Sequence, residues 1–441
     1  MATDYNNGGI RRVTIVPTSQ ITGGTTRAVL STGDERVPAV LYPYSTELEG
    51  GVEPITIVSG ANLDGGVMPI AIIEDVPAVK FNFMDGLLDP RLDFTRSNAA
   101  WYFNSSGLLT QAQIDQPRFD YGFPGSTTLQ GLLIEGGATN EALQSRDLTN
   151  ASWTKVNVTA LKDQTGIDGV ASSASKITAS AGNGTCLQAV TSTSSVRVLS
   201  AYVKRLVGSG NIQMTMDNGS TWTTVTVTAN WTRVAVPSQT LTNPTIGFRI
   251  VTSGDSIAVD CVQEEKRAVP TSPIPTTSAA GNRNQEVLTC SGTNFTSFYN
   301  QVEGTIKAEF MITTAQISGT ERNVLSIDND TANERIMILA DNGSAVPRAS
   351  ITDGGVSQAA LLSGAVSLNT VHKVVFAYKL NSVAANIDGG AFGTDTAATM
   401  PTPTQMKIGS RYNSTTSQLF GYIRSISYWA ERKVTPYLEA L

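Results

Sequence analysis

Histidine is almost absent from this sequence, and cysteine and charged residues are scarce. The 441 residues include one histidine, His372, and 15% of them are charged. A serine or cysteine nucleophile needs an imidazole that accepts and returns the proton, and His372 is the one available. His372 shares a face of an expected strand with Val374 and Phe376, so we interpret it as a structural residue. The sequence therefore predicts no catalytic residues and no enzyme.

The three cysteines, Cys186, Cys261 and Cys290, lie far apart without the spacing of a metal site. We interpret them as free, partly buried thiols, and a Cys186–Cys261 disulfide is the alternative. There is no phosphate loop, dinucleotide motif or zinc spacing. No cofactor and no metal are predicted.

Basic clusters and long apolar runs are also missing. The net charge is −6, and no basic run is longer than Arg11-Arg12, which argues against nucleic acid as a partner. No apolar run approaches the ~18 residues of a spanning helix, so no membrane insertion is expected. Residues 1–9 are polar and lack the apolar core of a signal peptide, so we expect a soluble protein that is not exported by the usual route.

Glycine, serine, threonine and asparagine are abundant instead, and turn formers interrupt the apolar residues without a helical period. This pattern predicts an all-β fold, and the length suggests about three units. Residues 1–84 form an N-terminal β arm in which Gly50–Ile57 recurs as Gly65–Ile72, each a glycine turn before a proline-opened strand. Since proline lacks a backbone donor, we expect these strands to pair with another copy or subunit; a small independent β-domain is the alternative.

Residues 141–268 alternate in the manner of short antiparallel strands. Ile246, Phe248 and Ile250 share one face of an expected strand, with Gly247 and Arg249 on the other. Such strands separated by turns predict an antiparallel β-sandwich.

Residues 269–290 are rich in proline, glycine, serine and threonine and are predicted to be a linker. Residues 291–441 then alternate again, with Ile306, Ala308 and Phe310 on one face of an expected strand. A second antiparallel sandwich is expected there.

Residues 85–140 have a specific residue order rather than a period. An Arg-Ser step is followed by an aromatic residue, a Gly-Leu turn, a Pro-Arg-Phe-Asp-Tyr step and a leucine-rich strand that ends in Glu and Asn. The positions are Arg96, Tyr102, Gly107, Pro117, Arg118, Phe119, Asp120, Tyr121, Leu132, Leu133, Ile134, Glu135 and Asn140. This order resembles the head spike fibre domain of tailed-phage virion proteins. We expect a packed collar in which Arg96, Arg118 and Asp120 form internal polar ties; the alternative is that these three are exposed.

Two further resemblances concern the sandwiches. Four segments of the first resemble a carbohydrate-binding-module jelly roll: 150–155, 200–204, 262–265 and 273–277. Four segments of the second resemble a laminin-G or concanavalin-A-like domain: 372–378, 386–390, 406–410 and 419–426. Both resemblances lie in framework strands, so they imply fold more than ligand.

Acidic pairs are the remaining catalytic candidates. Glycan hydrolysis needs two carboxyl groups facing one cleft. Glu264 and Glu265 are adjacent on a strand and should point to opposite faces, while Asp328 and Asp330 are expected at a hairpin tip. We interpret both pairs as non-catalytic. The oxygens of Asp328, Asp330 or Asp388 would suit calcium, but the ligand pattern of a calcium site is missing.

Sugar recognition commonly uses an aromatic face with amide and carboxylate hydrogen bonds. Of the five tryptophans, Trp222 and Trp231 flank a threonine-rich hairpin and are our candidates for a glycan platform. The alternative is that both pack inside the sandwich.

These features predict a structural virion protein of a tailed phage, a head spike, fibre or decoration that is assembled in the host cytoplasm. The arm is expected to bind a capsid or tail protein, and the sandwiches to contact host-surface glycans. A homo-oligomer is expected, a trimer as in many fibres, held by β-strand exchange or sandwich packing because no heptad run is present. The first alternative is a receptor-binding tail fibre or spike with lectin activity, and the second is an enzyme that trims host polysaccharide.

Overall fold

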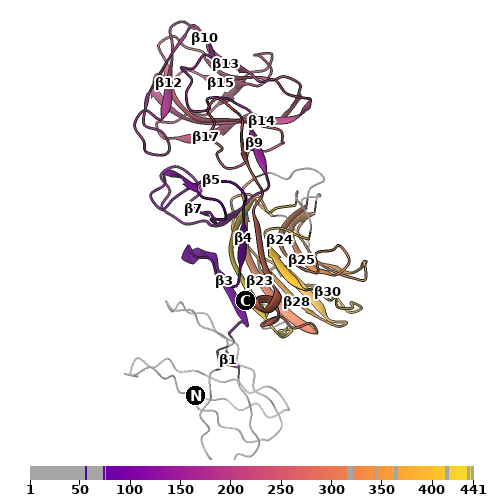
Figure 1. Ribbon diagram of the computed structural model, residues 1–441. Helices are drawn as coiled ribbons and strands as arrows, with labels where there is room; N and C mark the ends of the chain where they lie inside the picture. The colour runs from indigo at the N-terminus through magenta and orange to yellow at the C-terminus, as the bar shows by residue number, and fades with distance from the viewer. Residues whose placement is uncertain are drawn as a thin grey trace, which may run out of the picture. The chain divides into compact units, whose positions relative to one another are not determined.

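The computed structural model describes residues 55–56, 73–74, 76–314, 321–342, 346–361, 366–412, 417–434 and 438 (Figure 1). The chain divides into two units, residues 1–77 with 434–441, and residues 78–433. In the first unit, β1 (Ile55–Thr56) pairs with β2 (Ile73–Glu74) in an antiparallel ladder. Most of the predicted arm, 1–84, lies outside the described residues, so its role stays a prediction.

The second unit is built from antiparallel strands, which confirms the all-β prediction. Its described helical pieces are η1 (Phe83–Asp85) and α1 (Gly292–Thr296). Within the part of the chain that the structure describes, no helix has the length and apolar character needed to cross a membrane.

The first sandwich consists of two sheets between residues 154 and 265. The five-stranded sheet has the order β10 (Thr154–Val156), β13 (Gly184–Ala189), β19 (Thr245–Ile250), β15 (Ile212–Thr215) and β16 (Thr223–Val225). The six-stranded sheet has the order β11 (Val158–Gln164), β12 (Ala174–Ala179), β20 (Ser256–Glu265), β14 (Ser195–Val207) and β17 (Thr232–Ala235), with β18 (Gln239–Leu241) also on β14. Ile246, Phe248 and Ile250 face the buried core, as their alternation predicts.

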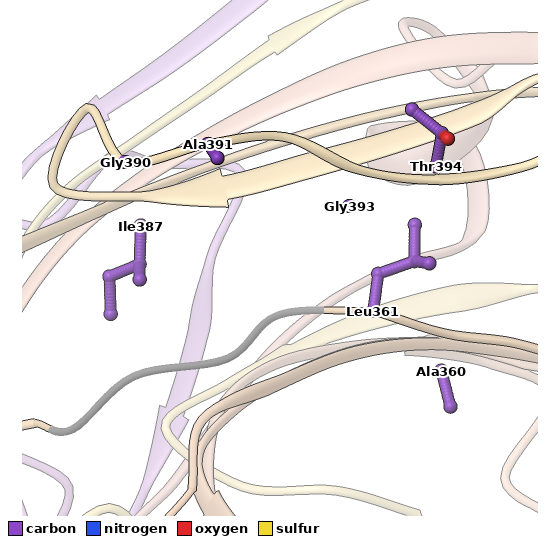
Figure 2. Close-up of a pocket in the computed structure, with 7 residues that line it drawn as sticks. All are labelled: Ala360, Leu361, Ile387, Gly390, Ala391, Gly393 and Thr394. Atoms are coloured by element: carbon purple, nitrogen blue, oxygen red, sulfur yellow. The ribbon is translucent and has the colours of Figure 1, made fainter.

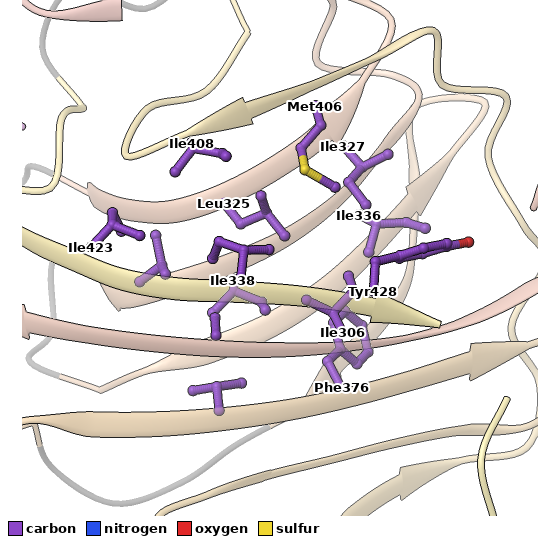
Figure 3. Packing of buried hydrophobic residues seen from close by; sticks show 14 of the residues in the cluster. Ile306, Leu325, Ile327, Ile336, Ile338, Phe376, Met406, Ile408, Ile423 and Tyr428 are labelled. Atoms are coloured by element: carbon purple, nitrogen blue, oxygen red, sulfur yellow. The ribbon is translucent and has the colours of Figure 1, made fainter. Parts of the chain in front are cut away.

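The second sandwich packs a seven-stranded sheet on an eight-stranded one. The seven-stranded order is β27 (Val356–Leu361), β26 (Arg348–Asp353), β25 (Arg335–Asn342), β24 (Glu321–Asp328), β31 (Gln405–Ile408), β22 (Val287–Ser291) and β4 (Asp93–Thr95). The eight-stranded order is β30 (Gly393–Asp395), β29 (Val383–Ile387), β28 (His372–Lys379), β23 (Glu303–Ile312), β32 (Gly421–Trp429), β8 (Gly131–Ile134) and β7 (Phe119–Asp120), with β3 (Val79–Asn82) also on β32. Figure 3 shows the core between them, where Ile306 and Phe376 of one sheet lie near Ile336 and Ile338 of the other.

The second sandwich is discontinuous in sequence, which differs from the predicted boundaries. Strands β3, β4, β7 and β8 come from the predicted arm and collar, yet they extend the sheets formed by residues 287–429. Their side chains Phe81, Phe94 and Ile134 belong to the same buried cluster as Ile306. The first sandwich is therefore inserted between two parts of the second.

The predicted linker, 269–290, is likewise part of the folded structure. Its strand β21 (Gly281–Arg283) pairs with β9 (Ala138–Asn140), and β22 begins within it. Ile274 and Glu286 are buried. A flexible spacer is the wrong description, because the backbone here is paired and the side chains are covered.

Candidate functional site

The collar motif builds a buried ionic cluster around Arg118, which is fully buried just before β7. Its Nε and Nη2 donate to the two carboxylate oxygens of Glu286, each at 2.7 Å. Nη2 also donates to Glu135 at 2.9 Å, and Nη1 donates to the Ser272 hydroxyl at 2.6 Å. One guanidinium thus joins segments that are up to 168 residues apart in the sequence.

Two more arginines complete the buried ionic cluster, defined as Arg96, Arg118, Arg283, Glu135 and Glu286. Arg96 Nη1 lies 2.9 Å from Glu286, and Arg283 Nη1 lies 3.2 Å from Glu135. Burial alone would raise the pKa of Glu135, but Arg283 and Arg118 outweigh it and lower that pKa to about 2. The Glu135 carboxylate is therefore ionised, and both carboxylates are bound by internal partners, which suits a structural tie rather than acid–base catalysis.

Asp120 forms a second buried tie in the collar. It accepts hydrogen bonds from the backbone N–H of Phe103 at 2.6 Å and from the hydroxyl of Tyr422 in β32. Burial raises its pKa. The other motif side chains, Tyr102, Phe119 and Tyr121, are half-buried beside it.

The hydrogen-bond partners of His372 were not evident from the sequence. Its Nδ1 donates to Asp388 at 2.7 Å, and its Nε2 lies 3.3 Å from the hydroxyl of Ser367, so a serine, a histidine and an aspartate line up. However, Nε2 lies 3.0 Å from both the backbone nitrogen and the backbone carbonyl oxygen of Ser367. A ring nitrogen held by the backbone of the same serine is poorly placed to take the proton of its hydroxyl group, which favours a framework role.

The acidic pairs are also held by protein partners. Glu264 accepts from Arg197 at 2.8 Å, whereas Glu265 accepts from the backbone and hydroxyl of Thr271. Both glutamates are fully buried. They lack the shared open cleft that glycan hydrolysis requires.

Asp328 is buried and accepts from the backbone N–H of Asp330 and from Gln405, each at 2.9 Å. Asp330 pairs with Lys407, and Asp388 is bound to His372 as described above. Among the described residues, no group of three or more potential ligands could hold a metal ion.

The cysteines are free and buried. Cys186 belongs to the core between the two sheets of the first sandwich, whereas Cys261 belongs to a cluster with Tyr202 on the outer side of the six-stranded sheet. The two side chains therefore lie on opposite sides of that sheet, which excludes the Cys186–Cys261 disulfide in this fold.

The two candidate tryptophans lie on different surfaces. Trp231 is half-buried against the cluster formed by Phe103, Leu109 and Tyr202, where the collar hairpin β5 (Ala100–Phe103) and β6 (Leu109–Ala112) covers the six-stranded sheet. Trp222 instead adjoins β16, at the edge of the five-stranded sheet. A joint platform of Trp222 and Trp231 is therefore not formed.

Trp222 belongs to an open polar surface that we call the five-stranded face: Thr185, Gln213, Trp222, Thr224 and Arg249. The strand register places Thr185, Arg249, Gln213 and Thr224 side by side in one row across four strands. The Arg249 guanidinium lies over the Trp222 ring at 4.3 Å from its centroid. The result is an aromatic ring, a cation, an amide and two hydroxyl groups on one face of the sheet, where Thr224 is exposed and the other four side chains are half-buried.

Part of this surface was visible in the sequence, where Arg249 alternates outward from its strand. Its neighbours on this surface could not be predicted in the same way. Gln213 and Thr185 are 36 and 64 positions away in the sequence and lie beside Arg249 only because of the strand register. The alternation of Thr185 and Gln213 with buried residues is the local signal that both face outward.

A separate hollow of about 320 Å³ lies at the rim of the second sandwich. Figure 2 shows its lining on two facing segments, Ala360 and Leu361 on β27, and Ile387, Gly390, Ala391, Gly393 and Thr394 on the β29–β30 hairpin. Thr394 is the one polar side chain among these residues. The other lining side chains are small or apolar, so the side chains offer few of the hydrogen bonds that fix a sugar or polarise a substrate.

Comparisons with known proteins give distant structural likenesses. No family model and no curated protein matches the chain. The CBM40 module of the Ruminococcus gnavus IT-sialidase, solved bound to α2,3-sialyllactose, is similar at 13% identity and a TM-score of 0.28, covering 33% of this chain and 86% of that one. The NanB sialidase of Streptococcus pneumoniae is similar at 13% identity and a TM-score of 0.29, covering 35% and 26%. A Limulus polyphemus SAP-like pentraxin is similar at 11% identity and a TM-score of 0.24, covering 31% and 68%. Likenesses at this level carry no argument about ligand or activity.

Proposed function

We propose that this protein is a non-enzymatic adhesion protein that binds glycans through the five-stranded face. The observation that carries the proposal is the Arg249–Trp222 stack with Gln213 beside it on an uncovered sheet. Sugars are commonly bound by an aromatic ring together with planar polar side chains that donate and accept hydrogen bonds. Trp222 supplies the ring, and Gln213, Thr185 and Thr224 supply the amide and hydroxyl groups.

A glycan array with the full chain tests this proposal. Bound glycans are expected, and Trp222→Ala should weaken their binding about tenfold or more, since an aromatic contact of this kind contributes on the order of 1 kcal/mol or more. Trp231→Ala is the matched control, because Trp231 packs under the collar hairpin and should change affinity little while it lowers stability. Equal binding by wild type and Trp222→Ala would contradict the assignment of this face.

The absence of catalysis is part of the same proposal. It is supported by the internal partners of Glu264, Glu265 and Asp328 and by the contacts of His372 Nε2 with the Ser367 backbone. Release of sugar fragments from a bound polysaccharide would contradict it. Loss of that release in Ser367→Ala would then assign the reaction to the Ser367–His372–Asp388 row.

We further propose that the chain is an exterior part of a tailed-phage virion, a head spike or fibre that the N-terminal arm attaches to a capsid or tail protein. The support is the residue order of 85–140, whose charged members Arg96, Arg118, Asp120 and Glu135 are all buried ties.

Immunogold labelling of phage particles tests the location. Label on the capsid is the expected result for a head spike. Label at the tail tip or baseplate would favour the alternative, a receptor-binding tail fibre or tail spike with lectin activity. Particles without label would contradict the virion assignment altogether.

A further inference from the structure

The guanidinium of Arg249 is held in one orientation by its neighbours. Its Nε donates to Gln213 Oε1 at 2.7 Å, and Gln213 Nε2 donates in turn to Thr224 Oγ1 at 3.1 Å. Trp222 lies against the flat side of the group. A guanidinium fixed both along its edge and over its face has little side-chain entropy left to lose on binding.

The two terminal nitrogens of Arg249 remain available. Among the described residues, no side chain or carbonyl accepts a hydrogen bond from Nη1 or Nη2 of Arg249, and no carboxylate pairs with it. These two nitrogens form the fork that matches the two oxygens of a carboxylate. The five-stranded face therefore presents two N–H donor groups, on Nη1 and Nη2 of Arg249, that have no acceptor among the described residues.

Three other arginines in or next to the first sandwich are paired with carboxylates. Arg146 pairs with Asp168 and Asp260, Arg197 with Glu141 and Glu264, and Arg205 with Asp255. These pairs hold loops and strand ends together.

The carboxylate nearest along the chain to Trp222 does not neutralise Arg249 either. Asp217 accepts from the Thr215 hydroxyl and from the backbone N–H of Thr221, each at 2.8 Å. Both bonds are accepted by Oδ1, which closes the turn before β16. The guanidinium of Arg249 therefore has no carboxylate partner among the described residues, and its positive charge favours the binding of an anionic ligand.

We propose that the five-stranded face selects a sugar that carries a carboxylate, such as a uronic or sialic acid residue of an acidic polysaccharide. This inference rests on the proposed glycan binding and names its ligand class. The carboxylate accepts from Nη1 and Nη2 of Arg249, while Trp222, Thr185 and Thr224 contact the sugar ring and its hydroxyl groups. Neutral glycans lack a carboxylate that accepts hydrogen bonds from Nη1 and Nη2 of Arg249, so they bind more weakly.

The test uses the full chain and a glycan array that contains uronate, sialylated, sulfated and neutral glycans. Each acidic glycan that binds is compared by calorimetry with its carboxyl-reduced form. We expect carboxyl reduction to weaken binding about tenfold or more, which is the scale of one charge-assisted bidentate contact. Arg249→Gln should weaken binding of the acidic glycan to the same extent.

The decisive readout is the coupling between the two changes. If the carboxylate is bound by Arg249, wild type and Arg249→Gln should bind the carboxyl-reduced glycan equally. Lys162→Gln is the matched control: it removes the same charge from β11 of the six-stranded sheet and should change affinity by less than about twofold. Unchanged thermal unfolding of Arg249→Gln excludes a folding defect.

The possible outcomes separate this inference from the proposed function. Glycan binding that is insensitive to carboxyl reduction and to Arg249→Gln overturns the acidic-sugar inference and leaves glycan binding in place. Preference for sulfated over carboxylated glycans also overturns it. Failure to bind any glycan overturns both.

Discussion

Replacing Arg118 by methionine is expected to lower the free energy of unfolding by about 3–5 kcal/mol, the usual cost of removing one partner of a buried ion pair. Methionine keeps much of the side-chain volume but removes all the donors. Glu286 then loses two hydrogen bonds of 2.7 Å, and Glu135 loses one of 2.9 Å, while both carboxylates stay buried. Urea unfolding of both proteins, followed by near-ultraviolet circular dichroism, measures the difference.

The control for this experiment is Arg91→Met. Arg91 pairs with Asp89 at the same 2.7 Å, but its side chain is 35% exposed. Solvent screens such a pair, so the expected loss is below about 1 kcal/mol. Similar small losses for both variants would show that the buried ionic cluster does not stabilise the fold.

A fragment of residues 284–441 is expected not to fold, whereas a fragment of residues 78–441 should. The shorter fragment keeps β22 but lacks β3, β4, β7 and β8. It thereby loses the buried side chains Phe81, Phe83, Phe94, Leu132 and Ile134 from the core of the second sandwich. At about 1.5–3 kcal/mol for each of these buried side chains, this loss is comparable to the ~5–15 kcal/mol by which a typical domain is stable.

Circular dichroism and thermal unfolding of the two fragments check this expectation. A cooperative transition in residues 78–441 together with its absence in residues 284–441 is the expected result. A cooperative transition in the shorter fragment would mean that the second sandwich is an independent, contiguous domain after all.

Local patterns in the sequence predicted the class of fold and many core positions. The alternation of Ile246, Phe248 and Ile250 places all three in the first core, and Ile306, Ala308 and Phe310 lie in the second as expected. Strand period and burial are local properties, so they can be read from consecutive residues.

The discontinuity of the second sandwich could not be read in this way. Strand β4 has three residues, and its partner β22 lies about 190 positions further on in the sequence. Nothing in a short strand specifies a distant partner. Arg283 and Glu286 were placed in a linker for a related reason: charged residues usually mark the surface, and their burial depends on partners from the collar.

The candidate site was predicted in part. The sequence indicated Trp222 as a candidate aromatic side chain and Arg249 as an outward-facing residue. The stack of Arg249 on Trp222, however, requires the pairing of β15, β16 and β19. Trp231 has the same sequence context as Trp222. The collar hairpin covers its surroundings, and this contact depends on residues 100–112, more than a hundred positions away.

The central claim is that the five-stranded face binds a glycan, and a crystal structure of the full chain with the strongest acidic glycan from the array tests it most directly. We expect sugar density against Trp222, with a carboxylate within hydrogen-bond distance of Nη1 and Nη2 of Arg249. Sugar bound elsewhere, for example in the hollow between Leu361 and Thr394, with the five-stranded face empty, would contradict it.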